Sequence, residues 1–146
     1  MRRTGFTLTE LLLTLTVLGI LVLAGIPKVA RMVQRARVNR ALTVVAGDLE
    51  HAVTIAARQR KPVRLSCTCG SGQYSVADRT GGTTRLNRQL ASDREYSVST
   101  LTFSATPVDI FPSGVTSADL VVTLGAAGYS RQVRLTTAGY VRILPP

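Results

Sequence analysis

The chain has 146 residues and a formal net charge of +10, from 18 basic and 8 acidic residues, and 45% of its residues are hydrophobic. This length suits one globular domain with an appendage, and the hydrophobic content excludes an intrinsically disordered chain. Two cysteines and one histidine are too few for a disulfide scaffold or for a zinc finger with four ligands. A membrane anchor, a polyanion partner, or both remain open.

The first long segment, residues 6–26, is apolar except for threonines and one charged residue, Glu10. It is close to the length of about 20 residues that a helix needs to cross a bilayer, and Pro27 follows it. The segment is hydrophobic on all sides, whereas a helix on a soluble core carries a stripe. A cleaved secretory signal stays open as an alternative, with residues 23–25 as a weak cleavage site.

Glu10 is the residue that distinguishes these readings. A carboxylate at this depth in a membrane costs about 2.5–3.5 kcal/mol on insertion scales, and such residues usually have a charged partner. Apart from the start of the chain, no basic residue lies near Glu10 in the sequence. The segment therefore predicts a membrane helix whose acid has a charged partner.

Residues 5–11, Gly-Phe-Thr-Leu-Thr-Glu-Leu, resemble the type III signal of type IV pilins and pseudopilins. The resemblance implies that prepilin peptidase removes residues 1–5 by cutting between Gly5 and Phe6, and that it N-methylates Phe6. It also implies that Glu10 neutralises the Phe6 amine of a neighbouring filament subunit. Gly19 and Pro27 fit the family pattern of a helix that bends or melts locally during assembly, and proline supplies a reason because it removes a helical hydrogen bond.

The same resemblance implies a location in the bacterial inner membrane. Residues 6–27 would cross the inner-membrane lipid once, and the C-terminal domain would lie in the periplasm. Five basic residues follow this segment closely and two precede it, which taken alone would place the C-terminal side in the cytoplasm. The leader motif decides in favour of the periplasm, because the cleavage signal must face its peptidase.

Residues 28–61 are predicted to continue the same helix with an amphipathic pattern that ends before Pro62. Apolar residues recur at intervals of three and four at Val29, Val33, Ala36, Val38, Leu42, Val45, Leu49, Ala52 and Ala56. Nine basic residues and two acids lie between Lys28 and Arg64. They are interpreted as a solvated face that meets anionic lipid headgroups, with contact to a polyanion as the alternative.

Residues 62–146 are predicted to form a β-rich domain, because short alternating segments are separated by glycine-rich turns. The fold class is therefore α+β, with a long N-terminal helix on a small, mainly antiparallel sheet, the pilin fold. Residues 78–95 are expected to form a long loop or an irregular edge. Strands are expected at 63–67, 74–77, 96–98, 101–105, 108–111, 120–124, 129–136 and 140–144.

Three C-terminal segments, residues 109–114, 131–135 and 137–142, resemble the H-type minor pseudopilins of type II secretion and the related T-type fimbrial minor pilins. The first branch implies a structural subunit, assembled with other pseudopilins or pilins, that supports protein export. The second implies, as the alternative, a minor pilin that binds DNA for natural transformation through a Gly-Arg-x-Arg stretch. Here that stretch is residues 139–142, in which Tyr140 replaces the first arginine and Arg142 matches the second. Arg131 and Arg134 would extend this patch.

Cys67 and Cys69 lie two apart on a predicted strand, so their side chains share a face. A disulfide between them needs a local bend, because their Cα atoms would lie near the upper limit for a bridge. An oxidising compartment favours the bond, and both states stay open. The sequence holds no cluster of acids, nucleophiles or metal ligands, so neither enzymatic activity nor a cofactor or metal is expected.

Overall fold

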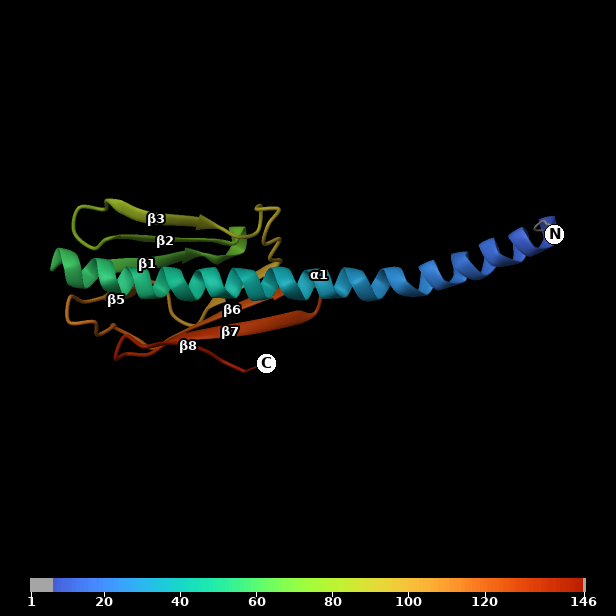
Figure 1. Cartoon of the computed structure of the whole chain (residues 1–146). Helices are drawn as coiled ribbons and strands as arrows, with labels where there is room; N and C mark the ends of the chain where they lie inside the picture. The colour runs from blue at the N-terminus through green and yellow to red at the C-terminus, as the bar shows by residue number, and fades with distance from the viewer. Residues whose placement is uncertain (1–6, 146) are drawn as a thin grey trace, which may run out of the picture. The chain divides into compact units, whose positions relative to one another are not determined.

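The computed structural model describes residues 7–145, apart from the side chains of residues 23–25 and 27. The chain divides into two compact units, Met1–Val33 and Gln34–Pro146. Helix α1, Leu8–Gln59, contributes to both units (Figure 1). The long helix predicted from the sequence is thus present, and it ends one residue before Arg60.

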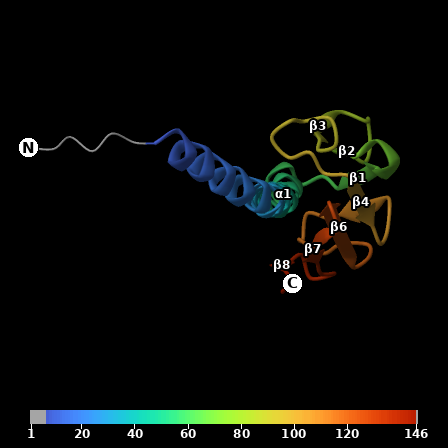
Figure 2. The ribbon, with the colours of Figure 1, turned by 90° about the vertical axis from the view of Figure 1, so that its right-hand side faces the viewer.

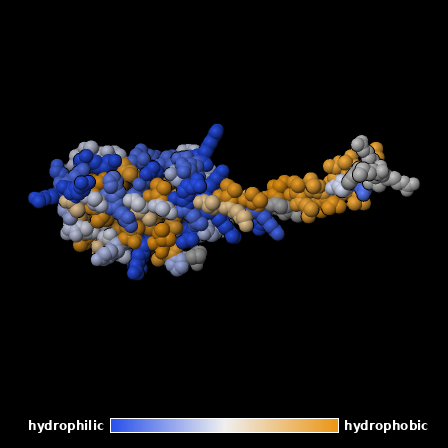
Figure 3. All heavy atoms as spheres, viewed as in Figure 1, coloured by the Kyte–Doolittle hydropathy of each residue, from blue (hydrophilic) through white to orange (hydrophobic). Residues whose placement is uncertain are grey.

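The first unit contains the N-terminal part of α1. Its large apolar side chains are exposed, among them Leu8 at 77% and Ile20 at 67%, and Figure 3 shows hydrophobic colouring along this part of the helix. Across the part of the chain whose side chains are described, which omits residues 1–6, 23–25, 27 and 146, no helix is long and apolar enough to cross a membrane.

The remainder of α1 packs its apolar stripe into the core of the second unit. The buried residues recur every three or four positions, at Val38, Ala41, Leu42, Val45, Ala46, Leu49, Ala52 and Ala56. Three residues predicted for this stripe are exposed instead: Val29, Val33 and Ala36. Val29 and Val33 belong to the first unit, in which the described residues 8–33 are all helical and supply no strand to cover them. The prediction was therefore wrong for the start of the stripe.

In the described part of the second unit, residues 34–145, eight strands form two four-stranded sheets instead of the single sheet expected. Sheet A has the order β3-β2-β1-β5, with β1 Val63–Thr68, β2 Gln73–Asp78, β3 Thr84–Gln89 and β5 Val108–Ile110. Sheet B has the order β4-β6-β7-β8, with β4 Thr100–Phe103, β6 Leu120–Ala126, β7 Tyr129–Leu135 and β8 Val141–Ile143. Every strand pair is antiparallel, and both sheets lie on one side of the C-terminal half of α1 (Figure 2).

Two segments differ from the sequence prediction. Residues 84–89 lie in the segment expected to be a long loop or an irregular edge, and they form the edge strand β3, which pairs with β2 across an irregularity between Val76 and Ala77. Conversely, residues 96–98 form the end of a turn and an irregular segment instead of a strand, because Tyr96 and Ser97 both donate backbone hydrogen bonds to the Asp93 carbonyl oxygen. Tyr96 is nevertheless 8% exposed, so its alternation with polar neighbours reflects a loop packed on the core.

Candidate functional site

The predicted processing residues, Gly5 and Phe6, lie outside the described residues. The description begins at Thr7, one residue before α1. Cleavage between Gly5 and Phe6 and methylation of Phe6 therefore stay predictions that chemistry on the purified chain must test.

Glu10 closes a capping box at the start of α1. The Thr7 hydroxyl accepts a hydrogen bond from the Glu10 backbone N–H at 3.3 Å, and the Glu10 carboxylate accepts from the Thr7 N–H and hydroxyl at 3.5 and 3.4 Å. This reciprocal arrangement satisfies backbone donors that a helix start leaves unpaired. The contacts to the carboxylate are long for hydrogen bonds and Glu10 is exposed. The carboxylate is thus held weakly and remains accessible to a cation.

Gly19 and Pro27, the predicted sites of bending, are both helical in α1. A Cβ atom added at Gly19 would meet nothing within 4 Å, so packing within the chain does not require glycine there. The Pro27 side chain lies outside the described residues. Local melting at these positions during assembly remains a prediction.

The arginines predicted to bind DNA lie on two different faces of the β7–β8 pair. Arg134 lies opposite Arg142 in the strand pairing, so both side chains lie on one face of sheet B. Arg131 lies an odd number of residues from Arg134 and projects to the other face, where it is half-buried and donates to the Leu144 carbonyl oxygen at 3.2 Å. The prediction that Arg131 extends the patch is therefore wrong.

Arg134 also forms an ion pair with Asp119. Its guanidinium donates to Oδ1 of that carboxylate at 3.1 Å and to Oδ2 at 2.9 and 2.5 Å. This hydrogen-bonded ion pair raises the pKa of Arg134. Tyr140 is 70% exposed, and with Arg142 it lines a concave site of about 510 Å³ at the β7–β8 turn. Of the predicted cations, only Arg142 is exposed without an ion pair within the part of the chain that the structure describes.

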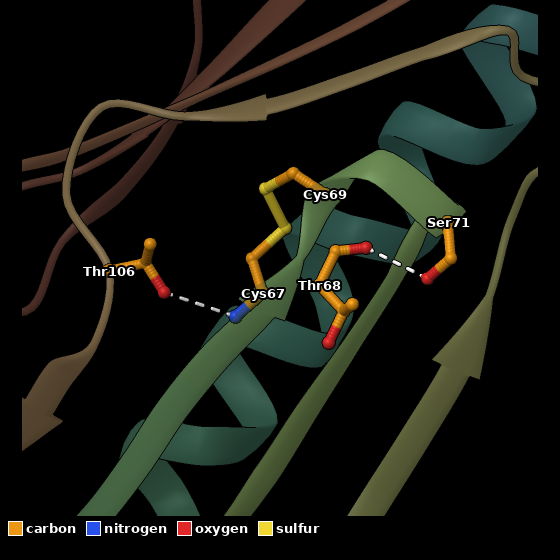
Figure 4. Close-up of a disulfide and its surroundings, with 5 residues drawn as sticks. All are labelled: Cys67, Thr68, Cys69, Ser71 and Thr106. Atoms are coloured by element: carbon orange, nitrogen blue, oxygen red, sulfur yellow. Dashed lines mark hydrogen bonds between the residues drawn. A yellow bond between two sulfur atoms is a disulfide. The ribbon is translucent and has the colours of Figure 1, made fainter.

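Cys67 and Cys69 are joined in a disulfide with a Cα–Cα distance of 5.1 Å (Figure 4). The bend that such a bond requires is present, because β1 ends at Thr68 and a short 3-10 helix, η1 (Cys69–Ser71), begins at Cys69. The loop between β4 and β5 contacts β1 beside the disulfide, since the Cys67 backbone N–H donates to the Thr106 hydroxyl at 3.1 Å. The disulfide therefore closes the corner between β1 and β2.

A buried polar cluster at Asp48, Tyr74 and Arg88 was not predicted. The Tyr74 hydroxyl donates to the Asp48 carboxylate at 2.5 Å, and the Arg88 guanidinium donates to both of its oxygens at 3.0 Å. Tyr74 is 1% exposed and Asp48 is 9% exposed. Burial, the hydrogen bond to Asp48 and its charge together raise the pKa of Tyr74. The cluster links α1 to β2 and to the edge strand β3.

One signal in the sequence points to this cluster. Asp48 lies three residues after Val45 and four before Ala52, on the buried stripe of α1. A buried carboxylate requires hydrogen-bonding partners, so an acid on an apolar stripe indicates a partner in the opposing sheet. The sequence does not say which side chains of that sheet meet it.

Comparisons with known proteins give matches over both parts of the chain. Residues 41–139 match the family model described as type II transport protein GspH, which is more than half of the chain. The chain belongs to the GspH family. Residues 1–26 match the prokaryotic N-terminal methylation motif. This GspH family member is thus a minor pseudopilin of the type IV pilin-like group, whose families consist of structural proteins.

Solved structures support the fold of this GspH family member. The type IV minor pilin FimU of Pseudomonas aeruginosa, in one crystal form, aligns with a TM-score of 0.63 and 13% identity over 76% of this chain and 90% of its own. A second crystal form gives a TM-score of 0.59 and 12% identity, over 73% and 92%. No curated protein matches the chain. At this identity the likeness shows the pilin fold, and none of these matches points to nucleic acid.

Proposed function

We propose that this chain is a minor subunit of a type II secretion pseudopilus, a structural protein that supports protein export. The family match over residues 41–139 carries this proposal. The methylation motif over residues 1–26 supports a subunit that enters the filament after processing by prepilin peptidase. The partners are then the peptidase, other pseudopilins and the lipid of the inner membrane.

The assembly step that we propose uses the chain's own charges. Processing exposes the Phe6 amine, a cation, within reach of the apolar segment of a neighbouring subunit. In that segment Glu10 is exposed and held only by long contacts to Thr7. Pairing the amine with Glu10 neutralises two charges that are expensive in lipid, so the pair favours a correctly aligned neighbour. The exposed apolar side chains of the first unit supply the remaining contact surface.

The membrane topology follows from the same proposal. Residues 6–27 cross the inner membrane once, and the second unit lies in the periplasm. A C-terminal alkaline phosphatase fusion reports this directly, because the enzyme is active only after export. An inactive fusion that is present at normal levels would contradict the topology.

The test of processing and assembly is mass spectrometry combined with substitution of Glu10. The mature chain is expected to begin at N-methylated Phe6. Glu10→Ala is expected to be processed normally and to be lost from cross-linked filaments, whereas the matched control Glu50→Ala, an exposed acid on the same helix, should assemble. A chain that retains Met1, or one that is cut beyond Ala24, would overturn the proposal.

A further inference from the structure

Four chain segments converge at one end of sheet A. The antiparallel order β3-β2-β1-β5 places the start of β1, the end of β2 and the start of β3 at the same end, since Val63 lies opposite Asp78 and Ala77 lies opposite Thr84. The end of α1 joins them through the short connection to β1, where the backbone N–H of Arg79 donates to the Pro62 carbonyl oxygen at 3.0 Å.

These segments bring together a group of charged side chains that we call the basic pole. In Figure 3 the corresponding end of the second unit, where α1 ends, is coloured hydrophilic. Six cations meet two carboxylates there, which leaves four positive charges in excess. The basic pole consists of Arg58, Arg60, Lys61, Arg64, Arg79 and Arg85 with Asp78 and Asp109.

The two carboxylates hold three of the guanidiniums. Arg64 donates to both oxygens of Asp109 at 2.7 and 3.1 Å, and Arg79 lies 3.3 Å from the same carboxylate. Arg85 donates to both oxygens of Asp78 at 2.9 and 2.7 Å. These arginines are therefore positioned and partly neutralised.

The other three cations carry the excess charge. Arg58, Arg60 and Lys61 are exposed, and among the described residues none of them has a hydrogen bond or an ion pair from its side chain. The hydrogen bond from Arg85 is the main cause that lowers the pKa of Asp78, and the charge of Lys61 adds a smaller contribution in the same direction. Three solvated cations thus lie together along the end of α1.

Arg60 occupies a backbone position that favours glycine. It follows the last residue of α1 and has a φ of 52°, the left-handed conformation in which helices commonly end with glycine. An arginine there is less favourable for the backbone than glycine would be. One compensation is the attraction of a cation to the helix C-terminus, and a second would be a ligand for the guanidinium.

We propose that the basic pole binds an acidic segment of another protein. Guanidinium groups pair with carboxylates in a planar, two-pronged geometry, and the excess charge is concentrated on a short run that matches a short acidic segment. A phosphate polymer fits less well, because tight binding to its backbone requires many contacts along an extended surface, whereas the excess charge here is confined to one short run. The contact of Arg79 with the Phe111 ring, at 6.0 Å from the guanidinium carbon to the ring centroid, adds an apolar edge that suits a polypeptide.

The test measures binding of a fluorescent Glu-rich peptide to the full-length chain in a non-ionic detergent, by anisotropy at low salt. The variant Arg58→Gln/Arg60→Gly/Lys61→Gln is expected to bind about tenfold more weakly, since exposed charge pairs each change affinity about two- to threefold. The control Lys28→Gln/Arg94→Gln/Arg142→Gln removes the same charge from exposed positions elsewhere and should bind like the unmodified chain.

The single variant Arg60→Gly separates binding from folding. It places glycine where the backbone favours it, so the melting temperature should stay the same or rise while peptide affinity falls about two- to threefold. Equal losses in the pole and control variants would show that only net charge matters and would overturn the proposal. So would the absence of peptide binding, or tighter binding of a single-stranded oligonucleotide of equal charge that is lost in the pole variant.

Discussion

The Asp48 cluster gives the sharpest prediction for stability, because three of its hydrogen bonds converge on one carboxylate. Tyr74→Phe removes only the hydroxyl that donates to Asp48 at 2.5 Å, and the ring keeps its place in the core. Asp48→Ala removes the acceptor, so that the Tyr74 hydroxyl, on a side chain that is 1% exposed, is left without an acceptor for its proton. Tyr129→Phe is the matched control, since its hydroxyl makes only long contacts, donating to Asn39 at 3.3 Å and accepting from Arg131 at 3.4 Å.

The magnitudes follow from what each substitution leaves behind. A hydrogen bond to a charged group contributes about 1.5–3 kcal/mol, and Asp48 keeps both bonds from Arg88 in Tyr74→Phe, so we expect a loss of about 1–2 kcal/mol. Asp48→Ala costs about 1–3 kcal/mol for the unpaired hydroxyl, and about 1 kcal/mol more for a partly exposed ion pair. We therefore expect about 2–4 kcal/mol for Asp48→Ala and under about 0.5 kcal/mol for Tyr129→Phe.

Urea unfolding of a fragment covering residues 34–146 measures these losses. Among the side chains that the structure describes, every buried hydrophobic one lies between Val38 and Leu135, so this fragment contains that core. Far-UV circular dichroism suits a chain without tryptophan. In the double variant Tyr74→Phe/Asp48→Ala the loss should fall short of the sum by about 1 kcal/mol or more. Additive losses, or a Tyr74→Phe as mild as Tyr129→Phe, would refute the reasoning.

Three further predictions concern the same fragment. Gly139→Ala should lower the free energy of unfolding by about 2–4 kcal/mol, because φ is +81° and the new Cβ would overlap the Gly114 carbonyl oxygen. The control Gly128→Ala, at φ +78° with open space around it, should lower it by only about 1 kcal/mol. Thiol counting on the unreduced protein should find no free thiol. Reducing the Cys67–Cys69 bond should lower the free energy of unfolding by at most about 1.5 kcal/mol, since the bond closes a very short loop. A larger loss would show that the fold at this corner depends on the bond. The hydrogen bond from Arg64, together with the charges of Arg64 and Arg79, lowers the pKa of Asp109. The contribution of ionised Asp109 to stability is therefore complete above about pH 4 and is lost as the pH falls through that lowered pKa. Arg64→Met should weaken this acid sensitivity, and an unchanged dependence of stability on pH would contradict the prediction.

The sequence predicted features that depend on local patterns. The long helix, its end near Pro62, and most of the strands followed from apolar spacing and turn residues. The division into two sheets was missed, because pairing between strands far apart in the chain, such as β1 with β5, leaves no local mark. The segment of β3 could be predicted only as a loop or an irregular edge, because five of its six side chains are polar and none is buried.

In the candidate site, too, local sequence patterns identify some residues, and only the fold brings the others together. Glu10 could be singled out from the sequence because a lone acid in an apolar segment is expensive, and its role in assembly stays a prediction. Arg131 was misplaced because its partner, the Leu144 carbonyl oxygen, becomes close only through the β7–β8 pairing. The Asp48 cluster joins residues 26 and 40 positions apart, and only the fold shows which side chains meet that carboxylate.

Glu10 has two different tasks in the isolated chain and in the proposed filament. Before assembly, its carboxylate caps α1 through contacts of 3.4 and 3.5 Å to Thr7, which are at the weak end of hydrogen-bond geometry. An ammonium group at close range offers a stronger, charge-assisted bond to the same oxygens. Loss of the capping contact costs about 0.5–2 kcal/mol, whereas an unpaired charge in lipid costs about 2.5–3.5 kcal/mol. The balance favours transfer of Glu10 from its own helix to the amine of a neighbour, so that the same carboxylate serves the free subunit as a cap and the filament as a contact.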